Sequence, residues 1–316
     1  MYRRNFLKYL GSGFIATNFA GCSDNSNLEK SVSFGGKSYE YKNGIFRQNG
    51  EGDGKIKIGV LADIHAREDN LEYFLNLLEK ENVEAYFVAG DLTYSFGDSQ
   101  GVSDNYDEMT KVMEQFTNLS KPVFVIPGNH EQKKAYSDFM RKFRESYNHV
   151  VDMEISPVAD LDDLTIVALG GIGNERFCVS EGYLKTKDKF EELEELAKKY
   201  SSEKPLMIGT HVPQSYKTKN GLDFLENGTH AFDPVGETLT KIKGVVKPIA
   251  SVSGHIHEAY GIITQKEELI KDGELVDRLD FNPGAVWDHL KRNYLKPSAG
   301  ILEFAQGKVK AYRFER

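Results

Sequence analysis

Five short apolar runs that each end in aspartate, asparagine or histidine constrain this sequence more than any other feature. The runs have the length and β-branched content of buried strands. Their endings are Asp63-Ile64-His65 after residues 56–62, Gly90-Asp91 after 85–89, Gly128-Asn129-His130 after 123–126, Thr210-His211 after 206–209, and Gly254-His255-Ile256-His257 after 249–253. No other strand-like run ends this consistently, so we predict that the five ends meet and hold two metal ions.

The order of the expected elements indicates the fold class. After the first run, Leu71, Phe74 and Leu78 recur with helical spacing, and similar stripes follow at 106–116, 136–143 and 187–200. Alternation of strands and helices predicts a parallel sheet flanked by helices. Strand-like runs then dominate from residue 164 onward, at 164–169, 261–264, 274–281, 300–304 and 309–314. We therefore predict an α/β fold in which two sheets stack and helices cover the outside.

Composition narrows the class of protein. The 316 residues are 40% hydrophobic and 28% charged, as expected of a soluble chain long enough for one large domain. The net charge of −8 argues against a protein that coats long nucleic acid, which usually carries a basic surface. It does not exclude a phosphate-ester substrate, because bound metal ions would reverse the local charge.

Residues 1–22 have the pattern of an export signal. Arg3 and Arg4 before Phe-Leu-Lys resemble a Tat signal, and the weakly apolar stretch that follows is too short to span a bilayer. Ala20-Gly21-Cys22 resembles a lipoprotein cleavage site. If Cys22 carries lipid, Cys178 is left without a disulfide partner. We predict an exported protein at the outer face of the cytoplasmic membrane or in the periplasm, tethered through lipidated Cys22.

The rest of the chain divides into a tether and a catalytic domain. Residues 23–54 are rich in Ser, Asn, Gly and Lys and are predicted to form a tether, with a small hairpin around 39–46. The catalytic domain is predicted to span 55–316. The long stretch 215–235, rich in turn residues, is predicted to form a loop over the site. The glycine-rich 170–173 is better explained as a turn than as a phosphate loop.

The polar strand ends supply a complete set of ligands for two ions. Asp63, Asp91 and Asn129 offer oxygen atoms, and Asp91 is the best placed to bridge two cations. Nitrogen atoms come from His65, His211, His255 and His257. Mixed oxygen and nitrogen ligands suit Mn²⁺, Fe, Zn²⁺ or Ni²⁺ better than Ca²⁺. Two such ions roughly 3.5–4 Å apart favour in-line displacement at phosphorus by a metal-bridging hydroxide. His130, beside Asn129, is the candidate proton donor to the leaving oxygen.

Taken in order, these five motifs resemble the signature of the calcineurin-like metallophosphoesterases, over about residues 55–316. The resemblance implies a four-layer αββα sandwich of two mixed sheets flanked by helices. It also implies that His130 acts on the leaving group or orients the phosphate. The implied ligand sets are Asp63, His65, Asp91 and His257 for one metal, and Asp91, Asn129, His211 and His255 for the other. Asn282-Pro283-Gly284 is similar to the Asn-Pro-Gly-Ser of the small phosphodiesterase branch, with Ala285 in place of Ser.

Other residues with the chemistry of a site receive structural interpretations. Gly90-Asp91-Leu92-Thr93-Tyr94 also matches the Gly-Asp-x-x-Tyr of purple acid phosphatases, whose tyrosine binds ferric iron. Those enzymes usually lack the histidine that this chain has at His65, so we expect Tyr94 to pack near the site. Trp287 is expected to anchor the core. Of the remaining histidines, His149 and His289 are expected at the surface or in packing, and His230 is expected to be exposed.

The predicted function is metal-dependent hydrolysis of phosphodiesters or phosphomonoesters. Diesters are favoured by the Asn-Pro-Gly similarity and by the lack of an evident basic clamp near the site. A nuclease is a second possibility, disfavoured by the acidic charge. A non-catalytic metal-binding scaffold is a third. Because family members without activity tend to lose the histidine that His130 represents, the enzyme leads.

Overall fold

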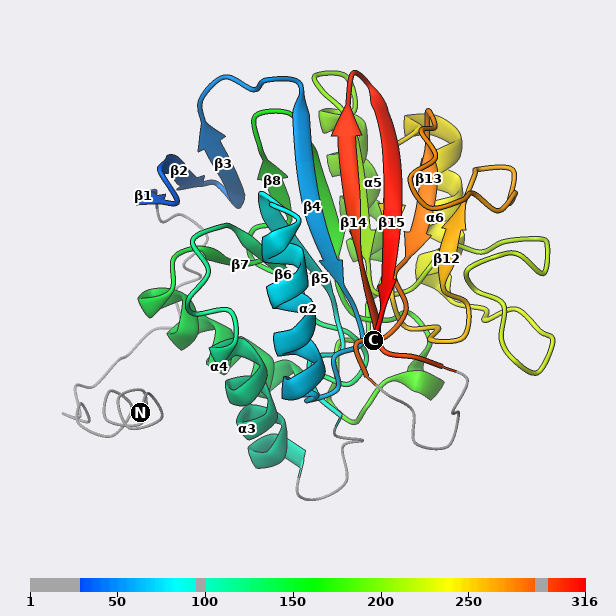
Figure 1. The fold of residues 1–316 in the computed structure, drawn as a ribbon. Helices are drawn as coiled ribbons and strands as arrows, with labels where there is room; N and C mark the ends of the chain where they lie inside the picture. Colours follow the sequence, from blue (N-terminus) through cyan, green and yellow to red (C-terminus); the bar gives the residue numbers. More distant parts are fainter. Residues whose placement is uncertain (1–28, 95–100, 288–294) are drawn as a thin grey trace.

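The computed structural model describes residues 29–94, 101–287 and 295–316, which form two β-sheets packed face to face (Figure 1). The larger sheet contains, in spatial order, β1 (Lys30–Phe34), β2 (Lys37–Lys42), β3 (Ile45–Asn49), β8 (Val158–Asp160), β9 (Thr165–Leu169), β10 (Leu206–Thr210), β11 (Ala250–Val252), β13 (Leu279–Asn282) and β12 (Gly261–Ile263). The smaller sheet contains β15 (Lys308–Glu315), β14 (Ser298–Ala305), β4 (Lys55–Leu61), β5 (Ala85–Ala89), β6 (Val123–Ile126) and β7 (Val150–Asp152).

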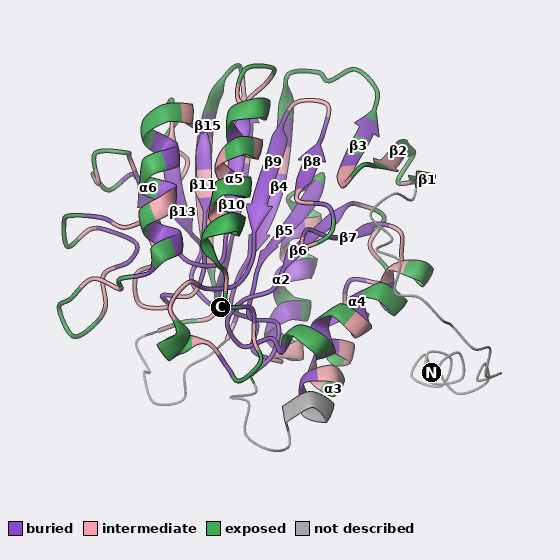
Figure 2. Ribbon diagram, turned by 180° about the vertical axis from the view of Figure 1, so that it is seen from behind, coloured by how far each residue is buried: buried purple, intermediate pink, exposed green. Residues whose placement is uncertain are grey.

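Helices cover the outer face of each sheet, and their inner faces are buried (Figure 2). The helices are α2 (Glu68–Lys80), α3 (Gly101–Glu114), α4 (Lys133–Ser146), α5 (Lys187–Tyr200) and α6 (Pro234–Val246), with a short 3₁₀ turn η1 (Glu175–Phe177). The apolar residues of α2, α3 and α4 pack with the smaller sheet, and those of α5 and α6 pack with the larger one. None of the helices in the described residues is long and apolar enough to cross a membrane.

Strand β5 shows how alternation along one strand builds two cores. Phe87 faces the layer between the sheets, whereas its neighbours Tyr86 and Val88 face the helices. Gly209 on β10 makes room for Phe87, because a Cβ atom at this glycine would lie 2.1 Å from the tip of the ring. The result is three apolar cores between four layers, which confirms the predicted αββα sandwich.

The predicted tether is wrong for residues 30–49. These residues form the antiparallel strands β1, β2 and β3, and β3 joins the larger sheet by pairing in parallel with β8. Phe46 is fully buried, and its ring lies 5.6 Å from that of Phe124 on the opposite sheet. The expected hairpin around 39–46 is present as β2 and β3. The predicted signal at 1–22, with Cys22, lies outside the described residues.

Two further segments differ from the expectation. Of the run 274–281, only its end belongs to a strand, β13. Helix α6 was not expected, although its start carries a recognisable signal. Asp233 accepts a hydrogen bond from the Val235 backbone as the N-cap, and Pro234 occupies the first turn.

Parallel pairing brings the polar strand ends to one edge of the sandwich. Strands β4, β5 and β6 run in parallel in one sheet, and β9, β10, β11 and β13 do so in the other. Consecutive parallel strands end on the same side, where open α/β sheets place their ligand sites. The segments that follow β4 and β11, on different sheets, meet there.

Candidate metal centre

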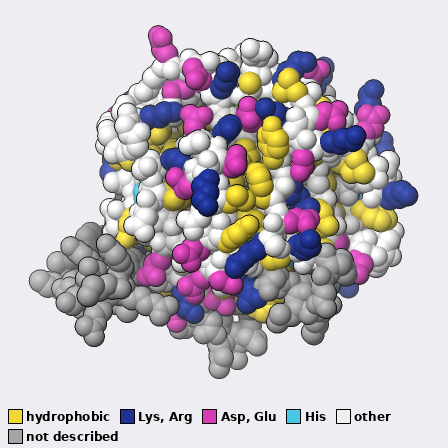
Figure 3. Space-filling model, viewed as in Figure 1, with side chains coloured by type: hydrophobic (Ala, Val, Ile, Leu, Met, Phe, Trp, Pro, Cys, Tyr) yellow, Lys and Arg dark blue, Asp and Glu magenta, His cyan; other side chains and the backbone are white. Residues whose placement is uncertain are grey.

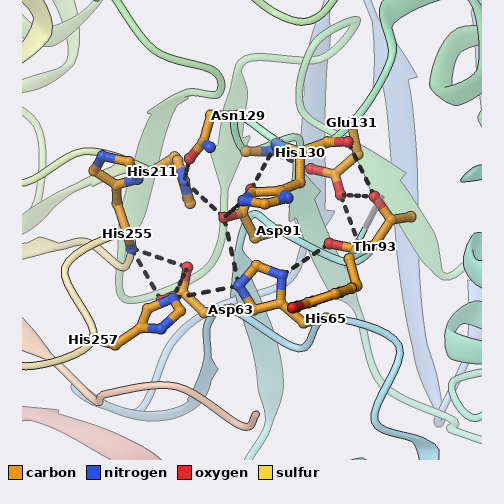
Figure 4. A network of polar contacts seen from close by, with 12 residues as sticks. Asp63, His65, Asp91, Thr93, Asn129, His130, Glu131, His211, His255 and His257 are labelled. Carbon is orange, nitrogen blue, oxygen red and sulfur yellow. Dashed lines mark hydrogen bonds and ion pairs between the residues drawn. The ribbon is translucent and has the colours of Figure 1, made fainter. Parts of the chain in front are cut away.

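The side chains predicted to bind metal point toward one another at this edge (Figure 4). His211 Nε2 lies 2.8 Å from Asn129 Oδ1, and His65 Nε2 lies 3.3 Å from His257 Nε2. The His255 backbone N–H donates to both carboxylate oxygens of Asp63, at 3.0 Å each. The structure thus brings together all seven residues: Asp63, His65, Asp91, Asn129, His211, His255 and His257.

Three overlapping groups of ligand atoms are compact enough to hold a metal ion. Within each group the atoms lie within 4.8 Å of one another. The groups are Asp63 with His65 and His257, Asp91 with His211 and His255, and His65 with Asp91 and His130. The first two fall within the two ligand sets that the resemblance implied. The third adds His130 to the cluster, beside Asp91.

Backbone carbonyls fix which ring nitrogen of two histidines faces the cluster. His65 Nδ1 lies 2.9 Å from the Thr93 carbonyl, and His211 Nδ1 lies 2.8 Å from the Ala89 carbonyl. A carbonyl only accepts, so each Nδ1 carries a proton and each Nε2 is left for another partner. This is the usual way in which proteins orient a metal-binding histidine.

The contact between His211 and Asn129 tests whether a cation fits. Asn129 donates its amide Nδ2 to the Phe177 carbonyl at 2.8 Å, so its oxygen is the atom that faces His211 Nε2. Two acceptor atoms 2.8 Å apart need a proton or a cation between them. A metal ion bound by both atoms would fit the place that a proton takes when no ion is bound.

The backbone is held in unusual conformations at the cluster. Asp63, His65, Asp91 and His255 all have positive φ angles, of 50°, 46°, 52° and 65°. Residues other than glycine adopt this region at an energetic cost, which proteins tend to accept at functional sites. Gly128 allows the closest approach, because a Cβ there would lie 2.0 Å from Asp91 Oδ1. The strand ends are shaped to bring these side chains together.

Electrostatics keeps the two carboxylates charged. Burial alone would raise the pKa of Asp91, but His211, His130 and His65 hold it well below its usual value. The same opposition, led by His257, lowers the pKa of Asp63. Two buried carboxylates of like charge require positive charge nearby.

The pKa values of the four histidines differ because different groups lie beside them. Burial lowers the pKa of His65 and of His255 to about 3, so both are neutral and able to bind a metal. His211 is also buried, yet Asp91 raises its pKa to about 9. Asp63 likewise raises the pKa of His257 against the effect of burial. Without an ion, protons on His211 and His257 balance the carboxylates.

Glu131 supports the cluster, and the sequence analysis gave it no role. Its carboxylate accepts hydrogen bonds from the backbone N–H groups of Thr93 and Gly128, at 2.9 and 2.6 Å. It thereby fastens the segment after β5 to the segment after β6. Burial and the nearby Asp91 raise its pKa to about 7. The only sequence signal was its place directly after Asn129-His130.

Asn282 in the Asn-Pro-Gly motif also binds backbone groups of the turn that carries two of the clustered histidines. Its Nδ2 donates to the carbonyls of Ile256, at 3.0 Å, and Ala259, at 3.3 Å. Its Oδ1 accepts from the Gly284 N–H at 2.9 Å. The motif therefore fixes the turn that carries His255 and His257, and it does not line the cavity beside the cluster.

A cavity of about 400 Å³ opens beside the cluster. One part of its wall consists of cluster residues, and the other part is the segment 176–179, which follows β9. The cavity is lined by Asp91, Asn129, His130, His255, His257, Arg176, Phe177, Cys178 and Val179. The long loop 215–235 contributes no residue to it, contrary to the expectation. One basic residue, Arg176, lines the cavity, although the sequence showed no evident basic clamp near the site.

The remaining candidates occupy varied positions. Tyr94 lies near the site as expected, with its ring edge-on to His65 at 5.9 Å between centroids. Trp287 was expected in the core, but its half-buried ring lies 5.1 Å from His65 and 5.5 Å from His257. His149 is buried and bonds to the Phe116 carbonyl.

His230 does not line the cavity, and it is less exposed than expected. It pairs with Asp223 at 2.7 Å within its own loop, and a fifth of its side chain is exposed. His289 lies outside the described residues.

Comparison with known proteins agrees with this geometry. Residues 56–259, well over half of the chain, match the model of the calcineurin-like phosphoesterase family. A comparison with curated protein sequences finds no match.

Solved structures share the fold at low identity. A dimetal phosphatase from Danio rerio is 12% identical with a TM-score of 0.53, covering 82% of this chain and 98% of its own. The protein TT1561 of Thermus thermophilus is 11% identical with a TM-score of 0.52, covering 81% and 97%. Purple acid phosphatase PPD1 from yellow lupin (Lupinus luteus) is 13% identical with a TM-score of 0.50, covering 89% of this chain and 59% of its own.

Proposed function

This chain belongs to the calcineurin-like phosphoesterase family, and we propose that it hydrolyses phosphate esters with two metal ions bound by its seven clustered side chains. The observation that carries the proposal is the meeting of these side chains beside a cavity. One ion would be held by Asp63, His65, Asp91 and His257, and the other by Asp91, Asn129, His211 and His255. Bound divalent ions of this kind neutralise phosphate charge and activate water. Mn²⁺, Fe, Zn²⁺ and Ni²⁺ all suit this donor set.

His130 is assigned the proton transfer to the leaving oxygen. Its side chain lines the cavity, whereas its backbone N–H donates to Asp91 Oδ1 at 3.0 Å. Its Nε2 lies 3.9 Å from Asp91 Oδ2. Asp91 thus holds the backbone of His130 in place and faces its ring. A histidine at hydrogen-bonding reach of a leaving group is suited to general acid catalysis.

Both ester classes fall within the proposal. The preference for diesters rested on two sequence features, and neither supports it in the folded chain. Arg176 places a cation at the cavity, which suits the second negative charge of a phosphomonoester. Asn282 bonds to backbone carbonyls and lies away from the cavity lining. We therefore propose hydrolysis of monoesters and diesters.

Two other functions are less well supported. On the face shown in Figure 3, acidic and basic side chains of the described residues are interspersed, which does not favour a long nucleic acid as substrate. A metal-binding scaffold without activity would not need His130 at the cavity wall. The presence of this histidine favours an enzyme.

Hydrolysis of bis-p-nitrophenyl phosphate and p-nitrophenyl phosphate with Mn²⁺ tests the proposal. We expect turnover by the wild type, and a loss of kcat on the order of 10²-fold or more for His130→Ala with both metal ions retained. Asp91→Ala should lose both activity and bound metal. His149→Ala, which changes a buried histidine outside the cavity lining, is the matched control and should keep activity. A wild type that is inactive with every divalent metal tried would favour the scaffold.

We also propose that the protein is exported and anchored to the outer face of the cytoplasmic membrane through lipidated Cys22. The proposal is supported by the paired Arg3 and Arg4 and by the sequence Ala20-Gly21-Cys22. Replacing both arginines with lysine should leave the protein in the cytoplasm. Cys22→Ser should release it from the membrane fraction and abolish labelling with radioactive palmitate. Labelling of the Cys22→Ser variant at the wild-type level would contradict the lipid anchor.

A further inference from the structure

The segment 173–179 is fastened firmly to the rest of the site. At its start, Asp233 accepts hydrogen bonds from the backbone N–H groups of Gly173 and Asn174. At its end, the Val179 N–H donates to the Asn129 carbonyl at 3.0 Å. In between, the Phe177 carbonyl accepts from the Asn129 side chain at 2.8 Å. Backbone contacts therefore fix this segment against a proposed metal ligand.

The side chains of Arg176 and Phe177 take no part in this fastening. Phe177 lines the cavity with 44% of its surface exposed, and Arg176 is exposed beside it. The Arg176 guanidinium lies 5.6 Å from the centre of the Phe177 ring. Among the described residues, no carboxylate forms an ion pair with Arg176. A large exposed ring on a rigid backbone, with a cation over it, is an arrangement suited to binding a ligand.

The position of the Phe177 ring indicates which part of a substrate would meet it. Its centroid lies 6.3 Å from that of His255, at an angle of 70° between the ring planes. A phosphate group bound at the cluster would therefore carry its ester group past this wall. The cavity volume of about 400 Å³ is near the lower end for small-molecule sites, enough for a phosphate and a compact organic group. A long alkyl chain would find few apolar residues to contact, since the other apolar lining residues are Cys178 and Val179.

We propose that Phe177 and Arg176 form a subsite for a planar aromatic group attached to the phosphate ester, so that the substrate is a nucleotide-like compound. The inference rests on the proposed function, because it places the phosphate at the metal cluster. Aromatic side chains and guanidinium groups are the surfaces on which nucleic acid bases stack in other proteins. Phe177 would stack with the ring, and Arg176 would add a positive charge beside it.

Two ligands that differ only in the base test this subsite. They are the phosphonate analogues of adenosine 5′-monophosphate and of ribose 5-phosphate, in which a methylene group replaces the ester oxygen and prevents hydrolysis. Binding to the Mn²⁺-loaded protein is measured by isothermal titration calorimetry. We expect the adenosine compound to bind the wild type on the order of 10-fold more tightly, the effect of one stacked base.

Variants separate a role in stacking from a role in structure. Phe177→Ala keeps the backbone carbonyl that holds Asn129, so it should retain two metal ions and its affinity for the ribose compound. It should lose most of the preference for adenosine. Phe232→Ala is the matched control, because Phe232 is 74% exposed and does not line the cavity. It should behave as the wild type does.

Three results would overturn the subsite. The first is equal affinity of the wild type for both ligands, and the second is an adenosine preference that persists in Phe177→Ala. The third is a Phe177→Ala variant that loses affinity for both ligands equally, or that loses bound metal. Either result would show that Phe177 only positions Asn129. Hydrolysis of bis-p-nitrophenyl phosphate and of p-nitrophenyl phosphate by the wild type is measured in parallel. An active enzyme without an adenosine preference contradicts the subsite alone, whereas an enzyme inactive toward both p-nitrophenyl esters contradicts the proposed function.

Discussion

His211 and Asn129 show how single residues are prepared for an ion by groups that are not ligands. The Ala89 carbonyl holds the proton of His211 Nδ1, and the Phe177 carbonyl holds the amide of Asn129. Both contacts are with backbone atoms, so no side chain in the sequence reveals them. The candidate ligands could be chosen from the sequence because metals bind particular types of atom. The groups that orient those ligands could not, because any residue can supply a carbonyl.

Asp152 makes the stability of the folded chain depend on pH, and this effect is independent of the metal cluster. It is buried on β7, where it accepts hydrogen bonds from the Tyr136 hydroxyl at 3.2 Å and the Glu154 N–H at 3.0 Å. Burial raises its pKa to about 6. The unfolded chain ionises this carboxyl near pH 4, so its burial begins to cost stability there, and the full cost applies above pH 6.

Replacing Asp152 with asparagine should therefore stabilise the protein at high pH. Asp152→Asn keeps an oxygen for both hydrogen bonds, and the gain in unfolding free energy should reach at most about 3 kcal/mol at pH 8. The gain should disappear below about pH 3, where the carboxyl is neutral in both states. Urea denaturation at the two pH values measures this difference. Asp138→Asn, at a half-exposed residue paired with Lys134 at 3.0 Å, is the control and should gain nothing. A gain of equal size at both pH values would contradict the assignment.

At the scale of elements, the strands and helices that frame the site were easier to predict than the segments between them. Strands β5 and β6 and helix α5 begin and end where the sequence analysis placed them. Each has a continuous apolar run or a clear helical stripe. The segment 174–179 has neither, since its conformation depends on Asp233 and Asn129, which are distant in sequence. The wall of the cavity therefore could not be predicted.

The hairpin of β2 and β3 was expected, but the place of β1 to β3 in the larger sheet was missed for a different reason. Their apolar residues Val32, Tyr39 and Phe46 are separated by polar residues and resemble a flexible segment in composition. Half of each strand faces solvent, so only alternate positions are apolar. This alternation of apolar and polar residues is the pattern of a sheet with one face exposed to solvent.

Phe46 tests whether these strands are part of the folded domain. Its ring is fully buried and contacts those of Tyr39, Tyr41 and Phe124. Phe46→Ala should lower the free energy of unfolding by about 3–5 kcal/mol, because it leaves a cavity in the core between the sheets. Lys42→Ala changes an exposed residue of the same hairpin and should alter stability by less than about 0.5 kcal/mol. If Phe46→Ala were as stable as the wild type in urea denaturation, these strands would not be part of the folded domain, and the interpretation of the segment as a tether would hold.

For the whole molecule, the candidate metal centre joins the two sheets, because its proposed ligands follow strands from both. Asp63 and Asp91 come from the smaller sheet, and His211 and His255 come from the larger one. In the absence of ions, the buried carboxylates of the smaller sheet face His211 and His257 of the larger one, which must carry protons. An ion that binds only the folded chain should therefore stabilise the sandwich as a unit.

Removal of metal should lower the melting temperature. With free Mn²⁺ at 100 times the dissociation constant, each occupied site adds about 2.7 kcal/mol to the free energy of unfolding. For a chain of this size, that corresponds to a rise of roughly 4 °C per site. Differential scanning calorimetry of chelated and Mn²⁺-loaded protein measures the shift. The shift should shrink as the pH falls through about 9, because Asp91 raises the pKa of His211 to about 9 and its proton then competes with the ion. Asp91→Asn weakens both sites and should lose most of the shift, and an equal melting temperature with and without metal in the wild type would show that the cluster holds no ion.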